Sequence, residues 1–265
     1  MRRAECLEGG TALIILETVA VAFSMFSAIP MPQFSWNERN MRYSLCAFPL
    51  VGAVIATCMF FWGKLCLLLS LPDILRGAGL CLVPVLITGG IHLDGYCDTC
   101  DALASHSDQE RRQEILKDPH LGAFAAIRLC VYFAADFALW TSLPELRPEV
   151  LVGLFCLSRS LSGLALTVFP LRPGSGLARS FAEAADRKRV RNVLLVLSAA
   201  LALLLLFFHA GEAVLAVALV FLYYRRLCIK NFGGLSGDLA GWFLQTAELW
   251  MLAALVLRTY VEAVL

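Results

Sequence analysis

Long segments that lack any charged side chain constrain this sequence more than any other feature. Residues 18–37, 43–63 and 77–93 contain no Asp, Glu, Lys or Arg. A helix needs about 20 mainly apolar residues to cross a bilayer, so these segments have the length of membrane helices. The whole chain is 59% hydrophobic and only 16% charged, which leaves too few polar side chains to cover a soluble domain. The sequence therefore predicts an all-α, polytopic integral membrane bundle surrounded by membrane lipid.

Further apolar segments raise the expected number of membrane helices to seven or eight, within a single domain over residues 1–265. These segments are 121–143, 150–170, 192–224 and 239–257. Residues 192–224 are long enough for two helices joined at His209-Ala210-Gly211, although the second, 213–227, is short for a full crossing. The net charge of only +1 gives no basic excess, so we expect no nucleic-acid partner. The sequence leaves open whether the chain forms a homo-oligomer.

The distribution of basic residues predicts how the helices are oriented. With eight spans, the odd-numbered connections carry 14 Lys and Arg residues, whereas the even connections and both termini carry 5. Basic residues favour the cytoplasmic side of membrane proteins. The odd connections are therefore expected in the cytoplasm and both termini outside.

Three aspartates follow the third apolar segment directly, in a connecting region at residues 89–122. Asp94, Asp98 and Asp101 are spaced i, i+4 and i+7, which places them within about 60° of one another on a helix. Carboxylates so close repel one another unless a cation lies between them. Oxygen ligands favour Mg²⁺ or Mn²⁺ over zinc, so this segment predicts a cytoplasmic helix that holds a hard divalent cation.

A second cluster follows in the same region. Glu114, Lys117 and Asp118 also share one helical face. Lys117 is suited to neutralise a phosphate, and Asp118 to complete a metal site or orient a nucleophile.

Two other interpretations of residues 89–122 remain open. One is a solvated acidic helix with surface salt bridges, which explains residues 108–112 but not the first three aspartates, because no Lys or Arg balances them. The other is a zinc site, since Cys-x-x-Cys is a zinc-ligand spacing. Its ligands would be His92, Cys97, Cys100 and His106. If the aspartates share a helical face, Cys97 and Cys100 point away from it into packing.

Two glycine-rich connections look suited to anions. Residues 171–191 contain Arg172, Gly174 and Gly176. Residues 225–238 end in Gly-Gly-Leu-Ser-Gly-Asp. Glycines let backbone N–H groups approach a ligand, and a helix N-terminus favours negative charge. We expect Gly233, Gly234 and Gly237 to contact phosphate, with Asp238 close to a metal bridging to it.

Charged residues inside the predicted spans are costly and default to pairing or function. Arg159 lies in the middle of the fifth span and is the best candidate for a cation that faces a ligand. Glu248, in the last span, is the best candidate acid.

The sequence resembles the cobalamin synthase family along nearly its whole length. The resemblance is carried by HLDGYCDTCD at residues 92–101 and EILKDPHLGAF at residues 114–124. The Pro-rich 29–32, the Phe-Pro-Leu-Val-Gly of 48–52, Arg159, the glycine-rich connections and Glu248 fall in the family's order. Ala102 and Ala125 stand where the family usually has Gly, which affects loop geometry more than chemistry.

The resemblance implies Mg²⁺-dependent adenosylcobinamide-GDP ribazoletransferase activity, a step of cobalamin biosynthesis. A hydroxyl of α-ribazole, or of its 5′-phosphate, would attack the corrinoid-side phosphorus of adenosylcobinamide-GDP, and GMP would leave. Asp94, Asp98 and Asp101 would hold Mg²⁺, while Asp118 or His92 would orient or deprotonate the hydroxyl. Phosphate and the leaving GMP would be bound by Lys117, Arg159, Arg172, Gly174, Gly176, Gly233, Gly234, Gly237, Asp238 and Glu248. The expected location is the bacterial inner membrane, with the active site facing the cytoplasm.

Two rival functions use the same acidic residues. A CDP-alcohol phosphotransferase also has an Asp-rich membrane motif, but Ala102 replaces the Gly that follows its Asp-x-x-Asp, and no Ala-Arg follows. A divalent-cation transporter would place its acids near the membrane midplane, often in repeated halves. Here the acids cluster in a connection, and the sequence has no internal repeat.

Overall fold

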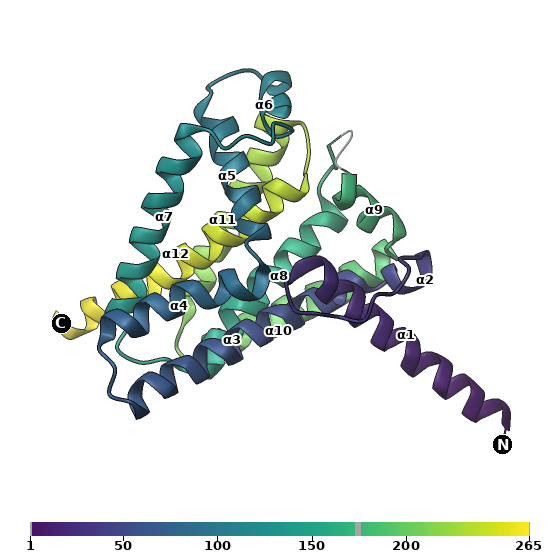
Figure 1. Ribbon diagram of the computed structural model, residues 1–265, viewed down its shortest axis with the longest axis horizontal. Helices are drawn as coiled ribbons and strands as arrows, with labels where there is room; N and C mark the ends of the chain where they lie inside the picture. Colours follow the sequence, from purple (N-terminus) through teal and green to yellow (C-terminus); the bar gives the residue numbers. More distant parts are fainter. Residues whose placement is uncertain (1, 173–175, 265) are drawn as a thin grey trace.

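The computed structural model describes residues 2–172 and 176–264, and in these residues all regular structure is helical (Figure 1). The helices are α1 (Arg2–Phe26), α2 (Glu38–Met41), α3 (Ser44–Leu68), α4 (Asp73–Thr88), α5 (Ile91–Ala104), α6 (Gln109–Ile115), α7 (Ala123–Ser142), α8 (Pro148–Val168), α9 (Gly176–Ala184), α10 (Arg187–Phe207), α11 (Gly211–Phe232) and α12 (Gly237–Val264). The predicted helical bundle is confirmed. Gly174 lies outside the described residues.

The central helix of the bundle is α8. Most residues of its apolar stretch, 89%, are buried, and the helix packs against α3, α10 and α12. By contrast, α7 and α10 expose most of their apolar side chains, as helices facing lipid do. Small residues along α8, such as Gly153 and Gly163, allow the neighbouring helices to approach closely.

Fewer helices than the predicted seven to eight have the length and composition of a complete span. Within the described residues, five helices are long and apolar enough to cross a membrane: α3, α7, α8, α10 and α12, or six if α4 and α5 count as one broken span. The apolar part of α1, Leu13–Phe26, is shorter. In α11 the charges of Glu212 and Arg225 leave only residues 213–224 between them uncharged. The turn predicted at His209-Ala210-Gly211 does separate α10 from α11.

A sharp bend separates α4 from α5, so the predicted continuous span at 77–93 is also wrong at its end. The two helices meet at 96°. Gly89 and Gly90 occupy the bend with φ values of +65° and +80°, a conformation that residues with side chains rarely adopt. The bend turns the Asp-rich segment back across the bundle as α5, which confirms that this segment is helical.

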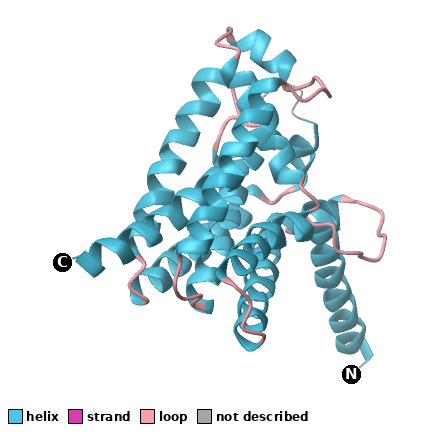
Figure 2. Cartoon of the chain, turned by 60° about the vertical axis from the view of Figure 1, so that its left-hand side comes forward, coloured by secondary structure: helices cyan, strands magenta, loops and turns pink. Residues whose placement is uncertain are grey.

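Loops join the helices at the top, right and bottom of the view in Figure 2, and contacts link the odd-numbered connections to one another. The first and fifth connections are joined by the ion pair of Arg42 with Asp186 at 3.2 Å. The third connection meets the end of α11, where Gln113 Nε2 donates to the Phe232 carbonyl at 2.8 Å. At the opposite end, Arg147 Nη1 donates to the Phe208 carbonyl at 3.0 Å and thereby joins two even connections. These contacts group the odd-numbered connections apart from the two even-numbered ones, and which side faces the cytoplasm stays a prediction.

Candidate functional site

Four carboxylates lie near one another where α5 packs against the start of α12. The charges of Asp94, Asp101 and Asp238 all act on Asp98 and repel its carboxylate. Within the described residues, none of the four forms an ion pair with Lys or Arg. The charge of Arg172 favours the Asp238 carboxylate, but four acids with one nearby arginine are still costly to assemble, and a cation would relieve the repulsion.

Glycines on both helices bring these carboxylates together. A Cβ on Gly95 of α5 would lie 2.8 Å from the Asp238 backbone, and one on Gly241 of α12 would lie 2.7 Å from the His92 carbonyl oxygen. The two backbones are therefore nearly in contact, as at small-residue interfaces of membrane helices. This contact adds Asp238 to the aspartates of α5.

Asp101 has a partner of its own. Its Oδ1 accepts a hydrogen bond from the Ala125 backbone N–H at 3.0 Å, in the first turn of α7. Its carboxylate also lies directly against Gly122. Asp101 thus holds the N-terminus of α7 to α5, a favourable position for a negative charge.

The donor chemistry of this region fits a hard divalent cation, although no ligand set is fully gathered. In the described residues, no three His, Cys, Asp or Glu side chains converge closely enough to hold a metal ion. This applies both to the three α5 aspartates and to the alternative zinc ligands. Mg²⁺ commonly binds through one or two carboxylates plus waters and substrate phosphates, which Asp94, Asp98 and Asp238 can provide. Cys97 and Cys100 are buried, as predicted.

Beside these carboxylates lies a cavity of about 280 Å³ with one polar and one apolar wall. The polar wall includes Asp94, Asp238, Ser236, Arg172 and His92. The Arg172 side chain is buried, and within the part of the chain that the structure describes its Nε and Nη1 have no hydrogen-bond partner. His92 Nε2 is likewise buried without a partner. Buried donors are almost always paired, so this wall has the character of a site for an anionic ligand.

The two predicted phosphate loops contact each other and position Arg172. Its backbone N–H donates to the Leu235 carbonyl at 3.0 Å, and the Leu235 N–H donates to the Pro170 carbonyl at 2.8 Å. Gly234 lies against the Arg172 backbone so closely that a side chain would not fit. Gly237 lines the cavity, whereas Gly176 begins α9 and Gly233 ends α11 beside Gln109.

The second predicted cluster lies away from the cavity. Lys117 and Asp118 are exposed, and neither lines the cavity. Asp118 accepts hydrogen bonds from the His120 ring and backbone, which hold the pKa of the Asp118 carboxyl below its usual range. Glu114 pairs with Arg111 at 2.7 Å. The described geometry does not bring this cluster to the aspartates of α5.

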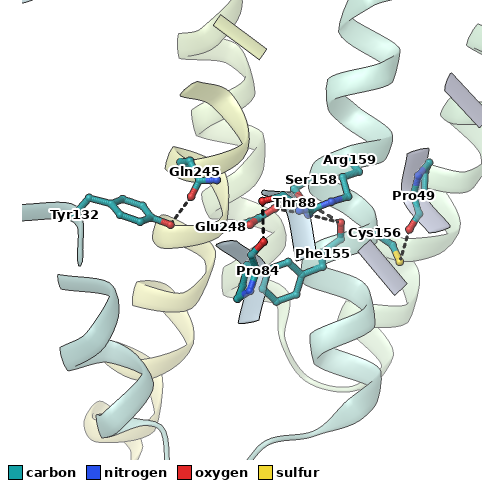
Figure 3. A network of polar contacts seen from close by, with 10 residues as sticks. All are labelled: Pro49, Pro84, Thr88, Tyr132, Phe155, Cys156, Ser158, Arg159, Gln245 and Glu248. Atoms are coloured by element: carbon teal, nitrogen blue, oxygen red, sulfur yellow. Dashed lines mark hydrogen bonds and ion pairs between the residues drawn. The ribbon is translucent and has the colours of Figure 1, made fainter. Parts of the chain in front are cut away.

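Arg159 and Glu248 were predicted separately as substrate contacts, and in the structure they pair with each other (Figure 3). Arg159 Nη1 donates to Glu248 Oε1, to the Ser158 hydroxyl at 3.2 Å and to the Phe155 carbonyl at 3.0 Å. Ser158 Oγ also donates to Glu248, at 2.7 Å. The pair joins α8 to α12 inside the bundle and does not line the cavity. Contact with substrate stays a prediction for both residues.

We expect the Arg159–Glu248 pair to act mainly in folding. Arg159→Met should destabilise the protein by about 3–5 kcal/mol, because it leaves Glu248 buried without a counter-charge. The double change Arg159→Met with Glu248→Met should recover most of that stability and retain turnover. Denaturant unfolding in mixed micelles and a turnover assay measure the two effects. A double variant that folds normally but is inactive would show that the pair serves the substrate.

Sequence reasoning missed several residues of the cavity. Its apolar wall uses Phe26, Phe48 and Phe181 from α1, α3 and α9, and Ser162 of α8 also lines it. Phe48 opens the motif of residues 48–52 but was given no role, and phenylalanine is so common in apolar helices that nothing in the sequence singled out Phe26 or Phe181. Ser162, one turn after Arg159 on a helix otherwise rich in apolar residues, is the one member with a visible signal.

Comparison of the sequence with known proteins shows which family the chain belongs to. The family model described as cobalamin-5-phosphate synthase matches residues 18–256. The chain belongs to this family. It is therefore an enzyme of cobalamin synthesis, and the cavity with its carboxylates and Arg172 is the candidate active site of a cobalamin-5-phosphate synthase.

Relatives named adenosylcobinamide-GDP ribazoletransferase cover nearly the whole chain. That of Lachnoclostridium phytofermentans is 43% identical over 91% of this chain and 94% of its own length. Those of Pseudomonas fluorescens and Clostridium botulinum are 36% and 31% identical, covering 90% and 89% of this chain and 98% and 95% of their own lengths. No solved structure matches this member of the cobalamin-5-phosphate synthase family.

Proposed function

We propose that this enzyme joins adenosylcobinamide-GDP to α-ribazole, or to its 5′-phosphate, and releases GMP in a Mg²⁺-dependent reaction. The observation that supports this most strongly is the buried Arg172 guanidinium, whose Nε and Nη1 have no hydrogen-bond partner among the described residues, in one cavity with Asp94 and Asp238. A diphosphate needs both features. Arginine grips phosphate oxygens through paired N–H donors, whereas carboxylates bind it only through a metal ion.

The proposed reaction is a displacement at phosphorus. The acceptor hydroxyl oxygen forms a bond to the corrinoid-side phosphorus, and the bond from that phosphorus to the GMP oxygen breaks. Mg²⁺, held by Asp94, Asp98 and Asp238, would neutralise the charge of the diphosphate. His92 is a better candidate than Asp118 to take the hydroxyl proton, because His92 lines the cavity whereas Asp118 is exposed away from it.

The remaining parts of the proposed site position these groups. Arg172 and the Gly234–Gly237 turn would bind the diphosphate, with Gly237 at the N-terminus of α12. Asp101 would fix α5 to α7 and thereby orient Asp98. Because the odd connections carry most basic residues, we propose that this end faces the cytoplasm of a bacterial inner membrane.

A turnover assay tests the proposal. Purified full-length protein in liposomes, given adenosylcobinamide-GDP, α-ribazole and Mg²⁺, should release GMP together with a cobalamin product. Chelation with EDTA should stop GMP release, and added Mg²⁺ should restore it, because the proposed transfer needs the cation. Protein that releases no GMP but moves Mg²⁺ across the liposome membrane would contradict the enzyme proposal in favour of a transporter.

A further inference from the structure

The apolar wall of the cavity is built from aromatic rings of three helices, α1, α3 and α9. The ring centroids of Phe26 and Phe48 are 4.1 Å apart, and those of Phe26 and Phe181 are 5.7 Å apart. The Phe48 ring also lies 5.8 Å from the His92 ring, which belongs to the polar wall. The aromatic wall, as we call Phe26, Phe48 and Phe181, therefore joins the polar wall through His92.

The aromatic wall offers almost no hydrogen bonds to a ligand. The side chains around it include Met25, Leu166 and Leu244, which are apolar. The donors and acceptors of the cavity belong instead to the polar wall and to Ser162. A flat ring fits such a surface well, because aromatic pairs gain energy beyond the apolar area they bury.

The chemistry of the wall distinguishes between the two bases of the proposed reaction. Guanine, in the leaving GMP, has polar groups along its edges, and those would be buried against the aromatic wall without partners. An unsatisfied buried polar group carries its full desolvation penalty. The base of α-ribazole is a benzimidazole whose outer edge is apolar, so it has no such penalty.

We propose that Phe26, Phe48 and Phe181 bind the base of the acceptor nucleoside and select a flat, apolar-edged base over a purine. This inference rests on the proposed transferase function. It places the acceptor between two surfaces: the base lies on the aromatic wall, and the ribose hydroxyl points toward Arg172 and the carboxylates. The aromatic wall thereby determines which lower base the product carries.

The test uses the full-length enzyme with Phe26→Ala and Phe26→Leu. Phe26 is only partly buried, and Leu keeps most of the volume while removing the ring, so at least one variant should fold. The matched control is Phe61→Ala on α3, whose side chain is 65% exposed on the outer surface. Measurements are the KM for each substrate from GMP release, and the Kd of α-ribazole alone from equilibrium dialysis.

We expect both Phe26 variants to raise the KM and the Kd of α-ribazole about tenfold, while the KM of adenosylcobinamide-GDP stays unchanged. Wild-type enzyme should prefer α-ribazole over the adenine counterpart at least about tenfold, and Phe26→Ala should reduce this preference. The Phe61 control should behave as wild type.

Two results would overturn the inference. One is an unchanged KM and Kd for α-ribazole in both Phe26 variants, and the other is a raised KM for adenosylcobinamide-GDP, which would place guanine on the wall. Failure of the proposed function looks different: wild-type enzyme would release no GMP. If wild type in that case still bound α-ribazole in dialysis and the Phe26 variants did not, the binding site for the base would be supported although the transfer reaction was not.

Discussion

Replacing Asp98 with Asn is expected to reduce turnover on the order of 10²–10³-fold without loss of folding. The proposed role of Asp98 is to hold the cation that neutralises the diphosphate, and the uncharged amide binds a hard cation poorly. The same change removes repulsion from Asp94, Asp101 and Asp238. The thermal unfolding temperature of the variant should therefore equal or exceed that of the wild type, since groups assembled for function often cost stability.

The control for this prediction is Glu110→Gln, the same chemical change at an exposed residue of α6 that is not among the charges acting on Asp98. Its turnover and unfolding temperature should match the wild type. Near-normal turnover of Asp98→Asn in liposomes would refute the proposed role of this carboxylate. A lowered unfolding temperature in Asp98→Asn would show instead that the charge serves folding.

Arg172→Lys is expected to reduce turnover about a hundredfold and to raise the KM of adenosylcobinamide-GDP. The positive charge is kept, so any loss measures the geometry of the guanidinium. Arg172 is buried, and none of the described residues accepts a hydrogen bond from its Nε or Nη1; in the proposed complex these donors bind two phosphate oxygens. A lysine ammonium cannot form the same pair of parallel hydrogen bonds.

Arg225→Lys is the control for the second prediction, because Arg225 is exposed on α11 and lies outside the cavity. It should leave both kcat and the two KM values unchanged. The result that contradicts the assignment is wild-type kinetics in Arg172→Lys. A rise in the KM of α-ribazole alone would also contradict it, by placing the acceptor on Arg172.

Local patterns predicted much of the fold and part of the site. The charge-poor segments marked the helices, and the i, i+4, i+7 spacing placed the three aspartates on the helix that the structure shows as α5. Both depend only on residues close in sequence. The number of spans was harder to predict, because a hydrophobic segment shows only its length and composition. The 96° bend at Gly89 and Gly90, which divides one predicted span into α4 and α5, depends on backbone conformation.

Contacts between distant helices were beyond sequence reasoning. Asp238 lies beside the aspartates of α5 only because Gly95 and Gly241 let α5 and α12 nearly touch. Likewise, Arg159 and Glu248 each looked like a ligand contact when considered alone, since charged residues in spans need a partner. That Arg159 pairs with Glu248 follows only from the packing of α8 against α12, which the sequence does not show.

The central claim is that the carboxylates of α5 and α12 hold a divalent cation together with the diphosphate. Binding of Mn²⁺ to purified wild type and Asp98→Asn, followed by electron paramagnetic resonance with and without adenosylcobinamide-GDP, measures this directly. We predict that wild type binds Mn²⁺, that adenosylcobinamide-GDP tightens the binding, and that Asp98→Asn loses most of it. Equal Mn²⁺ binding by the two proteins, or binding that adenosylcobinamide-GDP leaves unchanged, would contradict the account.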